Sequence, residues 1–313
     1  MNSGKVLFID TAHPYLGEEL TRIGFECVHY TGTSREEIID QLPLFTGVII
    51  RSKITLDADA LRHATQLRFI GRVGAGMENI DWKFAESMGI ACLNAPEGIR
   101  DAVAEHAMGM LLSLLNHLCR VNVEVRNGVW IREGNRGTEI KGKTVAIIGY
   151  GNTGGEFARR LSGFGARVIA YDKYKTDFSD QYVAEVQMDE VYNTADIISL
   201  HVPLTEETNQ LINAEYLFRF KKAVYLVNTS RGQCVNTADL MDALESGKVK
   251  GAALDVLECE NLSFENLDTA GLPEAIQRLF RSDKVILSPH IAGWTHESNY
   301  KLAGVLVEKI KKL

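Results

Sequence analysis

A short apolar run that leads directly into three glycines constrains the fold of this chain more than any other feature. The run begins the stretch AIIGYGNTGGEFARRL, residues 146–161, in which an amphipathic helical pattern follows Gly149, Gly151 and Gly154. A strand, a glycine turn and a helix in that order create a phosphate-binding site, because N–H groups at the start of a helix attract anions. We expect Gly149 to permit the tight turn, Gly151 to let a pyrophosphate approach, and Gly154 to let helix and strand pack closely. A tight turn that binds no ligand is the alternative.

An acidic residue at the end of the next apolar run strengthens the nucleotide interpretation. Asp172 ends the run RVIAYD, 18 residues after Gly154, where a carboxylate can accept hydrogen bonds from the ribose of adenosine. The same carboxylate would repel a 2′-phosphate, so the sequence predicts NAD as the cofactor in preference to NADP. Lys173 and Lys175 follow closely and would act in the opposite direction.

Apolar runs recur along the chain in two series, and helical patterns separate them. The first series occupies residues 6–10, 26–30, 47–51, 68–73 and 91–95, and the second occupies residues 144–150, 167–172, 196–202, 224–230, 251–256 and 284–290. The runs of the second series are nearly all apolar, as strands buried on both faces must be. Alternation of such runs with helices is typical of βαβ units. We therefore predict an α/β fold of two doubly wound parallel sheets.

Three helical segments have recognisable limits in the sequence. Residues 101–128 are apolar along much of their length and end in a glycine, which predicts one long helix. Ser34 and Glu37 have the spacing of a capping box at a helix start. Residues 295–313 predict a closing helix, whose lysines near the end suit a helix C-terminus.

Size and charge restrict the class of protein. The 313 residues, 45% of them hydrophobic, suffice for about two domains. The net charge is −7 and the cations are scattered, so we expect no nucleic-acid or membrane partner and favour a small anionic ligand. The first apolar run is too short for a signal peptide, which predicts a cytoplasmic protein. No C-x-x-C pair suggests a zinc site or a disulfide framework among the five cysteines, which are Cys27, Cys92, Cys119, Cys234 and Cys259.

Longer strings carry a more specific signal than the glycines alone. They are IRSKITLDADAL (50–61), GRVGAGMENID (71–81), GIACLNAPEG (89–98), AVAEHAMGMLL (102–112), GKTVAIIGYGNTGGEFARRL (142–161), LHVPLTEETNQLI (200–212), LVNTSRG (226–232), GAALDVLECE (251–260) and LSPHIAGWT (287–295). Together they resemble the D-isomer-specific 2-hydroxyacid dehydrogenases, nearest to the D-3-phosphoglycerate dehydrogenase branch.

The resemblance implies a domain organisation and an assembly. Residues 1–100 plus 291–313 would form a flavodoxin-like substrate-binding domain, and residues 101–290 a Rossmann-type NAD-binding domain inserted into it. This insertion would explain why the glycine turn comes so late in the chain. The resemblance also implies a homodimer, held largely by the 101–128 helix and the segment 131–143 after it.

The family transfers a hydride between a 2-hydroxy acid and NAD, and three residues match its catalytic set. Arg231 corresponds to the arginine that grips the substrate carboxylate and polarises the reacting oxygen, His290 to the acid/base, and Glu260 to the carboxylate that favours its imidazolium form. Glu258, two residues earlier, competes with Glu260 for the last role. Asn261 stands where the family commonly has proline, and the segment 261–283 is longer than expected.

The resemblance also implies binding residues for both ligands. For the cofactor they are Gly149, Gly151, Asn152, Thr153, Gly154, Asp172, Val202, Pro203, Thr208, Thr229, Ser230, Asp255 and Gly293, with Asp255 expected at the nicotinamide carboxamide. For the anionic substrate they are Arg51, Arg72 and the backbone nest of Gly74, Ala75 and Gly76. Lys53 is as readily explained as surface charge. We interpret His106 and His201 as structural and Asn236 as a helix-capping change.

The identity of the substrate is the least constrained expectation. Arg51 and Arg72 favour 3-phosphoglycerate and 3-phosphohydroxypyruvate, while glycerate, lactate, glyoxylate, hydroxypyruvate and branched 2-oxo acids stay open. Because the sequence ends at Leu313, we expect no C-terminal regulatory domain. An NAD(H)-sensing protein-binding module is the alternative function, since fold alone does not establish turnover.

Overall fold

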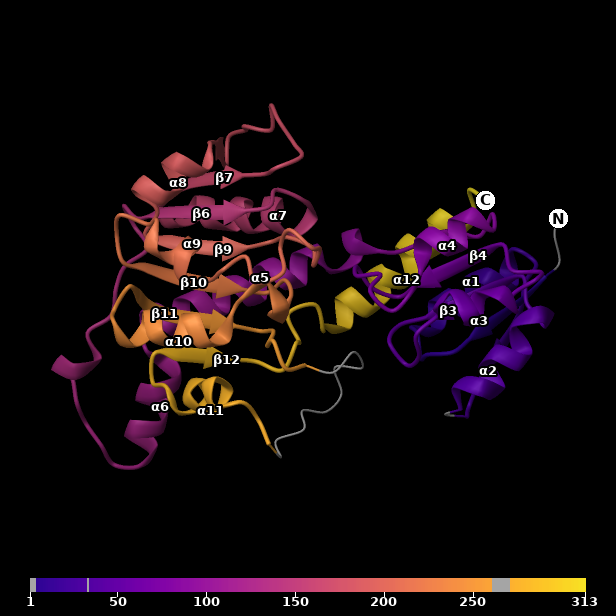
Figure 1. Cartoon of the computed structure of the whole chain (residues 1–313), viewed down its shortest axis with the longest axis horizontal. Coiled ribbons are helices and arrows are strands. Elements are labelled where there is room, and N and C mark those ends of the chain that lie inside the picture. The colour runs from indigo at the N-terminus through magenta and orange to yellow at the C-terminus, as the bar shows by residue number, and fades with distance from the viewer. Residues whose placement is uncertain (1–3, 33, 261–270) are drawn as a thin grey trace. The chain divides into compact units, whose positions relative to one another are not determined.

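A computed structural model describes residues 4–32, 34–260 and 271–313 of the chain. They form two compact units (Figure 1). Unit 1 comprises residues up to Arg100 together with Trp294–Leu313, and unit 2 comprises residues from Asp101 up to Gly293. Asn261, and with it the first part of the unexpectedly long 261–283 segment, lies outside the described residues.

Unit 1 contains a five-stranded sheet in which every pairing is parallel. Its order is β2-β1-β3-β4-β5. The strands are β1 (Lys5–Phe8), β2 (Glu26–His29), β3 (Gly47–Ile50), β4 (Phe69–Arg72) and β5 (Ala91–Leu93), and the helices are α1 (Pro14–Arg22), α2 (Arg35–Gln41), α3 (Ala58–Arg62), α4 (Trp82–Ser87) and α12 (His296–Ile310). Leu7 and Val48 pack with residues of α2, α3 and α4, whereas Val6 and Ile49 pack with α1 and α12. Alternate strand residues thus point to opposite faces of the sheet, and helices cover both faces.

Unit 2 contains a seven-stranded parallel sheet of order β12-β11-β10-β9-β6-β7-β8. Its strands are β6 (Thr144–Ile148), β7 (Arg167–Tyr171), β8 (Ala184–Glu185), β9 (Ile197–Leu200), β10 (Val224–Asn228), β11 (Val249–Leu254) and β12 (Val285–Leu287). Its helices are α5 (Pro96–Leu115), which begins in unit 1, α6 (Leu118–Arg126), α7 (Asn152–Leu161), α8 (Met188–Thr194), α9 (Ala214–Phe218), α10 (Thr237–Glu245) and α11 (Glu274–Arg281). The sequence did not predict β8, because a two-residue edge strand leaves no apolar periodicity.

Both faces of the unit 2 sheet are also buried. Ile148 and Leu200 join the cluster that includes residues of α8, α9, α10 and α11, while Ile147 and Ile197 join the cluster of α5 and α7. The prediction of two doubly wound parallel sheets is therefore confirmed. Among the described residues no helix is long and apolar enough to cross a membrane.

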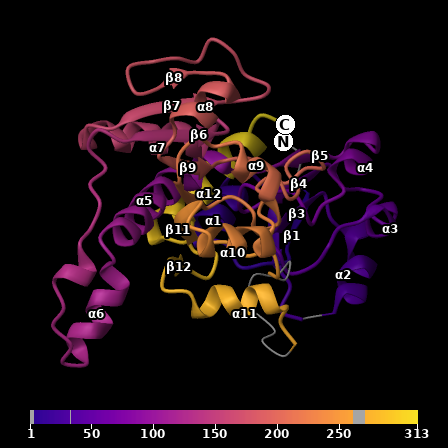
Figure 2. The same ribbon diagram turned by 60° about the vertical axis from the view of Figure 1, so that its left-hand side comes forward.

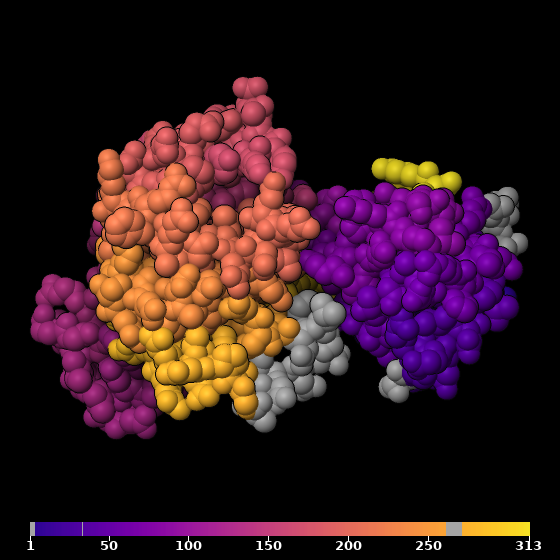
Figure 3. Space-filling view, in the orientation of Figure 1, coloured from indigo at the N-terminus to yellow at the C-terminus, as the bar shows by residue number. Residues whose placement is uncertain are grey.

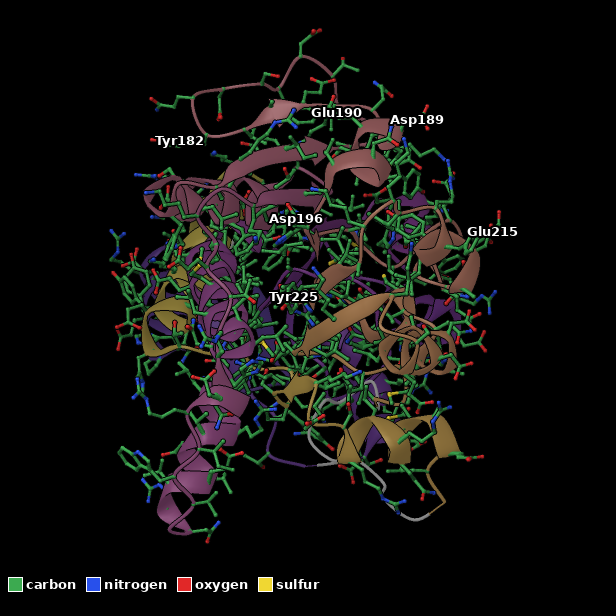
Figure 4. The ribbon with its side chains drawn as sticks, turned by 90° about the vertical axis from the view of Figure 1, so that its left-hand side faces the viewer. Tyr182, Asp189, Glu190, Asp196, Glu215 and Tyr225 are labelled. Carbon is green, nitrogen blue, oxygen red and sulfur yellow. The ribbon has the colours of Figure 1, made fainter. Side chains whose placement is uncertain are left out.

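The amino edge of this sheet is fixed by Asp196, which lies near Tyr225 in Figure 4. Its carboxylate accepts hydrogen bonds from the Thr144 N–H at 2.9 Å and from Lys222 Nζ at 3.1 Å. Burial alone would raise the pKa of Asp196, but these two donors outweigh it and lower the pKa. The ionised carboxylate thereby joins the starts of β6 and β9.

The single long helix predicted over residues 101–128 is wrong. The structure has two helices, α5 and α6, which are separated at Asn116 and His117, where His117 adopts the left-handed φ of 55°. The second helix, α6, is more polar than α5 and contains no buried residue. Tertiary packing, which supports α5 and not α6, decides where the first helix stops. Gly128, with φ of 76°, follows the end of α6.

The capping box predicted at Ser34 is half present. Ser34 Oγ accepts the Glu37 N–H at 3.3 Å, so Ser34 caps α2 as expected. The carboxylate of Glu37 instead accepts a hydrogen bond from the Tyr30 hydroxyl at 2.6 Å.

Candidate active site

The candidate residues of unit 2 follow the carboxyl ends of neighbouring strands. The glycine turn follows β6, Asp172 follows β7, the segment 201–208 follows β9, Arg231 follows β10, Asp255 and Glu260 follow β11, and His290 follows β12. Chain connections run in opposite directions from the β6–β9 pair, which makes this pair the topological switch point. Ligands of open α/β sheets bind at such a point, outside the carboxyl ends of the strands.

The three glycines of the turn differ in what a side chain at each position would meet. A Cβ on Gly149, whose φ is 93°, would lie 2.5 Å from the carbonyl oxygen of His201. A Cβ on Gly154 would lie 2.3 Å from the carbonyl oxygen of Gly149. A Cβ on Gly151 would meet nothing within 4 Å. Only Gly151 leaves open space at the start of α7, where Asn152 and Thr153 form the first turn.

Asp172 already accepts hydrogen bonds from the backbone around the glycine turn. Its carboxylate oxygens accept the N–H groups of Tyr150 at 2.8 Å, Tyr174 at 2.9 Å and Lys175 at 3.1 Å. Burial alone would raise the pKa of Asp172, but these N–H donors outweigh it and lower the pKa. The carboxylate is therefore ionised, and Oδ2, which accepts only the Tyr150 N–H, keeps a lone pair for another donor.

The two neighbouring lysines have partners of their own. Lys173 Nζ lies 2.7 Å from a carboxylate oxygen of Glu207, and Lys175 Nζ donates to the carbonyl of Tyr150 at 2.9 Å. Neighbouring oxygens thus already bind both ammonium groups, which weakens the attraction that the two lysines would exert on a 2′-phosphate.

His201 is buried next to the glycine turn. Its ring nitrogens lie 2.9 Å from Ser199 Oγ and 3.1 Å from Thr153 Oγ1. Burial lowers the pKa of His201 to about 3, so the ring is neutral at physiological pH. A neutral, enclosed imidazole that supports the first turn of α7 agrees with the structural interpretation.

Glu260 and His290 form a direct pair. Glu260 Oε2 lies 2.7 Å from His290 Nδ1, and Glu260 Oε1 accepts the N–H of Leu257 within the same turn. His290 adopts a left-handed φ of 54° and its N–H donates to the carbonyl of Asp255 at 2.7 Å. The structure thereby separates the two acids that sequence left in competition, since Glu258 bonds elsewhere, to Thr237 and Gln210.

Arg231 is held by a neighbour that the sequence analysis missed. Fully buried Asn228, the last residue of β10, donates to the carbonyl of Arg231 at 2.9 Å and accepts from the N–H and hydroxyl of Ser230. Arg231 Nη1 donates to the carbonyl of Ser230 at 2.7 Å. The available signal was a polar residue at the end of an otherwise apolar run.

Asp255 organises the segment that carries His290. Its carboxylate, 1% exposed, accepts the Ser288 hydroxyl at 2.6 Å and the N–H groups of Ile291 at 2.9 Å and Ala292 at 2.8 Å. Burial would raise the pKa of Asp255, but hydrogen bonds from these groups and from His106 lower it. His106 Nε2 lies 2.9 Å from Ser288 Oγ, which agrees with its structural interpretation. The predicted contact between Asp255 and nicotinamide stays a prediction.

Several predicted cofactor residues line the turn after β9. Thr208 Oγ1 donates to the carbonyl of Pro203 at 2.6 Å, and half-buried Val202 packs against the core of unit 2. Gly293 is the last residue of unit 2.

Asn236 caps α10 by accepting the Asp239 N–H at 3.0 Å, as a capping change predicts.

In unit 1 the predicted anion-binding residues follow β3 and β4. The sequence analysis missed Asp10, which follows β1 and accepts the N–H groups of Arg51 at 2.6 Å, Ser52 at 3.2 Å and Lys53 at 3.3 Å. The Arg51 guanidinium lies 4.5 Å over the ring of Trp294, a second residue that was missed. This stacking holds the cation in a fixed position.

The glycine nest of unit 1 is narrower than predicted. The Gly74 N–H donates to the carbonyl of Arg72 at 2.9 Å, so an anion site would rest on the N–H groups of Ala75 and Gly76. A Cβ on Gly74 would lie 1.5 Å from Arg72 Nη1, so glycine is required for the buried arginine to fold back over the turn. Asn94 Nδ2 donates a hydrogen bond to the carbonyl of Ala75 at 2.7 Å.

Comparison with known proteins identifies the family. Residues 108–292 match the model of the NAD-binding domain of D-isomer specific 2-hydroxyacid dehydrogenases. The chain belongs to this family. It is 37% identical over 278 residues to a hydroxypyruvate reductase of Thermotoga maritima, covering 89% of this chain and 88% of that one. It is 34% identical over 308 residues to a D-3-phosphoglycerate dehydrogenase of Archaeoglobus fulgidus, covering 98% of this chain but only 56% of that relative.

A solved structure agrees with the family assignment of this dehydrogenase. The D-lactate dehydrogenase of Aquifex aeolicus, complexed with NAD and lactic acid, matches it with a TM-score of 0.83 and 28% identity, covering 98% of this chain and 94% of that one. NAD is the cofactor of the family domain.

Two features of unit 2 in this dehydrogenase fit NAD. The space over Gly151 at the start of α7 suits a pyrophosphate, which the first N–H groups of a helix can bind. Thr229 Oγ1, at the end of β10, is buried without a hydrogen-bond partner within the described chain. Such a hydroxyl is costly to leave unpaired, and a polar ligand could supply its partner.

Proposed function

We propose that this chain catalyses hydride transfer between NAD(H) and a D-2-hydroxy acid or its 2-oxo acid, with Arg231, Glu260 and His290 as the catalytic residues. The observation that carries the proposal is the 2.7 Å contact of Glu260 with His290, because it joins an acid/base to a carboxylate on neighbouring strand ends. Arg231 follows the adjacent strand. Its planar guanidinium suits a carboxylate.

The three residues divide the tasks in the reduction of the 2-oxo acid. NAD in its reduced form, when bound, supplies the hydride that reaches C2. Arg231 holds the substrate carboxylate and stabilises the negative charge that develops on the carbonyl oxygen. Since Nδ1 of His290 faces Glu260, the proton for this oxygen comes from Nε2. Glu260 stabilises the imidazolium before that transfer. The oxidation uses the same groups in reverse.

We assign the remaining predicted residues by unit. Unit 2 supplies Gly151, Asp172 and Thr229 to the cofactor, together with the neighbouring residues predicted above. Unit 1 supplies Arg51, Arg72 and the N–H groups of Ala75 and Gly76 to the anionic substrate.

The substrate proposed is 3-phosphoglycerate with its 2-oxo acid, 3-phosphohydroxypyruvate. Support comes from two arginines at the carboxyl edge of the unit 1 sheet and from similarity to a phosphoglycerate dehydrogenase. The similarity to a hydroxypyruvate reductase makes unphosphorylated hydroxypyruvate the second candidate.

A panel of 2-oxo acids tests the function. With NADH, 3-phosphohydroxypyruvate should have the largest kcat/KM, exceeding hydroxypyruvate, pyruvate and glyoxylate by at least about tenfold, because a site built for a polar group rejects analogues that lack it. Arg51→Ala should lower kcat/KM for 3-phosphohydroxypyruvate more than it lowers kcat/KM for hydroxypyruvate. Preference of the wild type for hydroxypyruvate would establish the second candidate, and no NADH oxidation with any acid would favour the NAD(H)-sensing module.

A tighter complex with NAD(H) than with NADP(H) is expected from Asp172. Asp172→Asn should narrow the ratio of the two dissociation constants by about tenfold, since it removes the charge that opposes a 2′-phosphate while one oxygen still accepts backbone N–H groups. Titration of protein fluorescence with each nucleotide measures the ratio. Equal affinities of the wild type for the two nucleotides would contradict this role of Asp172 and indicate that Lys173 and Lys175 offset its charge.

We also propose that the chain forms a homodimer through the arm, defined as residues 117–136. Figures 2 and 3 show α6 extending from the rest of unit 2, and α6 has no buried residue. The arm exposes Leu118, Val123, Val125, Val129, Trp130 and Ile131, with Trp130 79% exposed. An apolar surface of this kind favours a partner.

Removing the apolar character of the arm should separate the dimer. Val123→Asp combined with Trp130→Glu is expected to yield a folded monomer of 34.7 kDa in light scattering, while Phe218→Glu, at an 83% exposed residue of α9, should stay dimeric. A wild-type monomer, or a dimer that persists in the double variant, would contradict the proposal.

A further inference from the structure

The turn that carries Glu260 is anchored at two places outside the proposed catalytic residues. We propose that Glu258 is a positioning residue, which holds the 257–260 turn against the start of α10 and against Gly232 so that Glu260 meets His290. This inference rests on the proposed function, because it concerns the effectiveness of the Glu260–His290 pair.

The first anchor is the carboxylate of Glu258. Its Oε2 accepts the Thr237 N–H at 3.1 Å and the Thr237 hydroxyl at 2.8 Å, and its Oε1 accepts Gln210 Nε2 at 3.3 Å. Thr237 is the first residue of α10 and only 6% exposed. A negative charge at a helix N-terminus is favourable, and three donors fix its orientation. One carboxylate therefore ties the turn after β11 to the buried start of α10.

The second anchor is a backbone contact at Gly232. A Cβ on Gly232 would lie 2.0 Å from the carbonyl carbon and oxygen of Leu257 and 2.7 Å from the backbone nitrogen of Glu258. The residue after Arg231 thus touches the peptide that precedes the Glu260 segment. Two of the proposed catalytic residues therefore project from backbone segments that are packed together with no side chain between them.

The turn itself is too small to fix Glu260 alone. Its internal bonds are the Glu260 N–H to the Leu257 carbonyl at 3.2 Å and the Leu257 N–H to Glu260 Oε1. Both bonds lie inside the turn and would move with it. The bonds of Glu258 leave the turn, so together with the contact at Gly232 they fix where Glu260 Oε2 stands relative to His290.

A second explanation of any effect of Glu258 is its charge, only two residues from Glu260. Positioning and charge separate in Glu258→Gln, because a glutamine oxygen can still accept both hydrogens of Thr237 while the charge is gone. Positioning predicts that Glu258→Gln behaves nearly as the wild type and Glu258→Ala does not. A charge effect predicts that the two variants behave alike.

The test uses the full chain with NADH and the best 2-oxo acid of the panel. Glu258→Ala should lower kcat about 10- to 100-fold, while KM and the dissociation constant of NADH change little. The reason is that a displaced Glu260–His290 pair no longer holds the proton in line with the substrate oxygen. Glu258→Gln should restore kcat to near the wild-type value.

Asp239→Ala is the matched control for lost stability. Asp239 also lies in the first turn of α10, but its carboxylate accepts the Ala214 N–H at 2.8 Å, at the start of α9. It should lower the melting temperature without lowering kcat. The positioning role is overturned if Glu258→Ala keeps the wild-type kcat, if Glu258→Gln is as impaired as Glu258→Ala, or if Asp239→Ala lowers kcat equally. Wild-type turnover in His290→Ala would instead overturn the proposed function.

Discussion

His290→Ala should lower kcat by about 10²–10⁴-fold and leave the dissociation constant of NADH nearly unchanged. The magnitude is that of losing a general acid/base. The nucleotide affinity should survive because the ring acts on the substrate proton, while the glycine turn and Asp172 follow other strands. Stopped-flow turnover and fluorescence titration measure the two quantities separately.

His201→Asn is the control for this substitution. Its neutral, enclosed ring contacts Ser199 and Thr153, so its loss should affect stability and nucleotide affinity more than the chemical step. A kcat of His290→Ala within a few-fold of the wild type, combined with a large loss in His201→Asn, would reverse the two roles.

Arg231→Ala should raise KM and lower kcat together. The same guanidinium anchors the carboxylate in the bound substrate and stabilises the charge that develops on the reacting oxygen, and removing one such donor costs about 10²–10³-fold in kcat. Steady-state kinetics with the preferred 2-oxo acid checks the expectation.

Arg231→Lys distinguishes charge from geometry. Lysine keeps the charge but lacks the planar fork, so we expect recovery of part of KM and little of kcat. If Arg231→Ala raised KM alone, Arg231 would be a binding residue without a part in the chemical step.

Local patterns predicted the parallel sheets, because buried strands must be apolar wherever they occur in the chain. They did not predict the break at His117, because α5 ends where packing partners end, and those partners exist only in the tertiary structure. The two-residue β8 was missed for a related reason. Its pairing with β7 is a long-range contact that leaves no periodicity in the sequence.

The candidate site divides in the same way. The sequence named Arg231, His290 and the glycine turn, because strings of residue types mark them. It favoured Glu260 but left Glu258 as a competitor, because two carboxylates in one turn are chemically identical until their neighbours are known. The structure pairs Glu260 with His290 and places Glu258 at the start of α10.

The sequence by itself determined the two parallel sheets, the glycine turn after β6 and the family, since strand burial, glycine spacing and motif strings are properties of neighbouring residues. Only the tertiary structure decided which acid meets His290, that a side chain on Gly151 would meet no neighbouring atom, and which distant residues hold the turns of the candidate site, among them Asp10 and Asp255. These are contacts between segments far apart in the chain, and a hydrogen-bond partner or an open space exists only once the strands that carry those segments lie side by side.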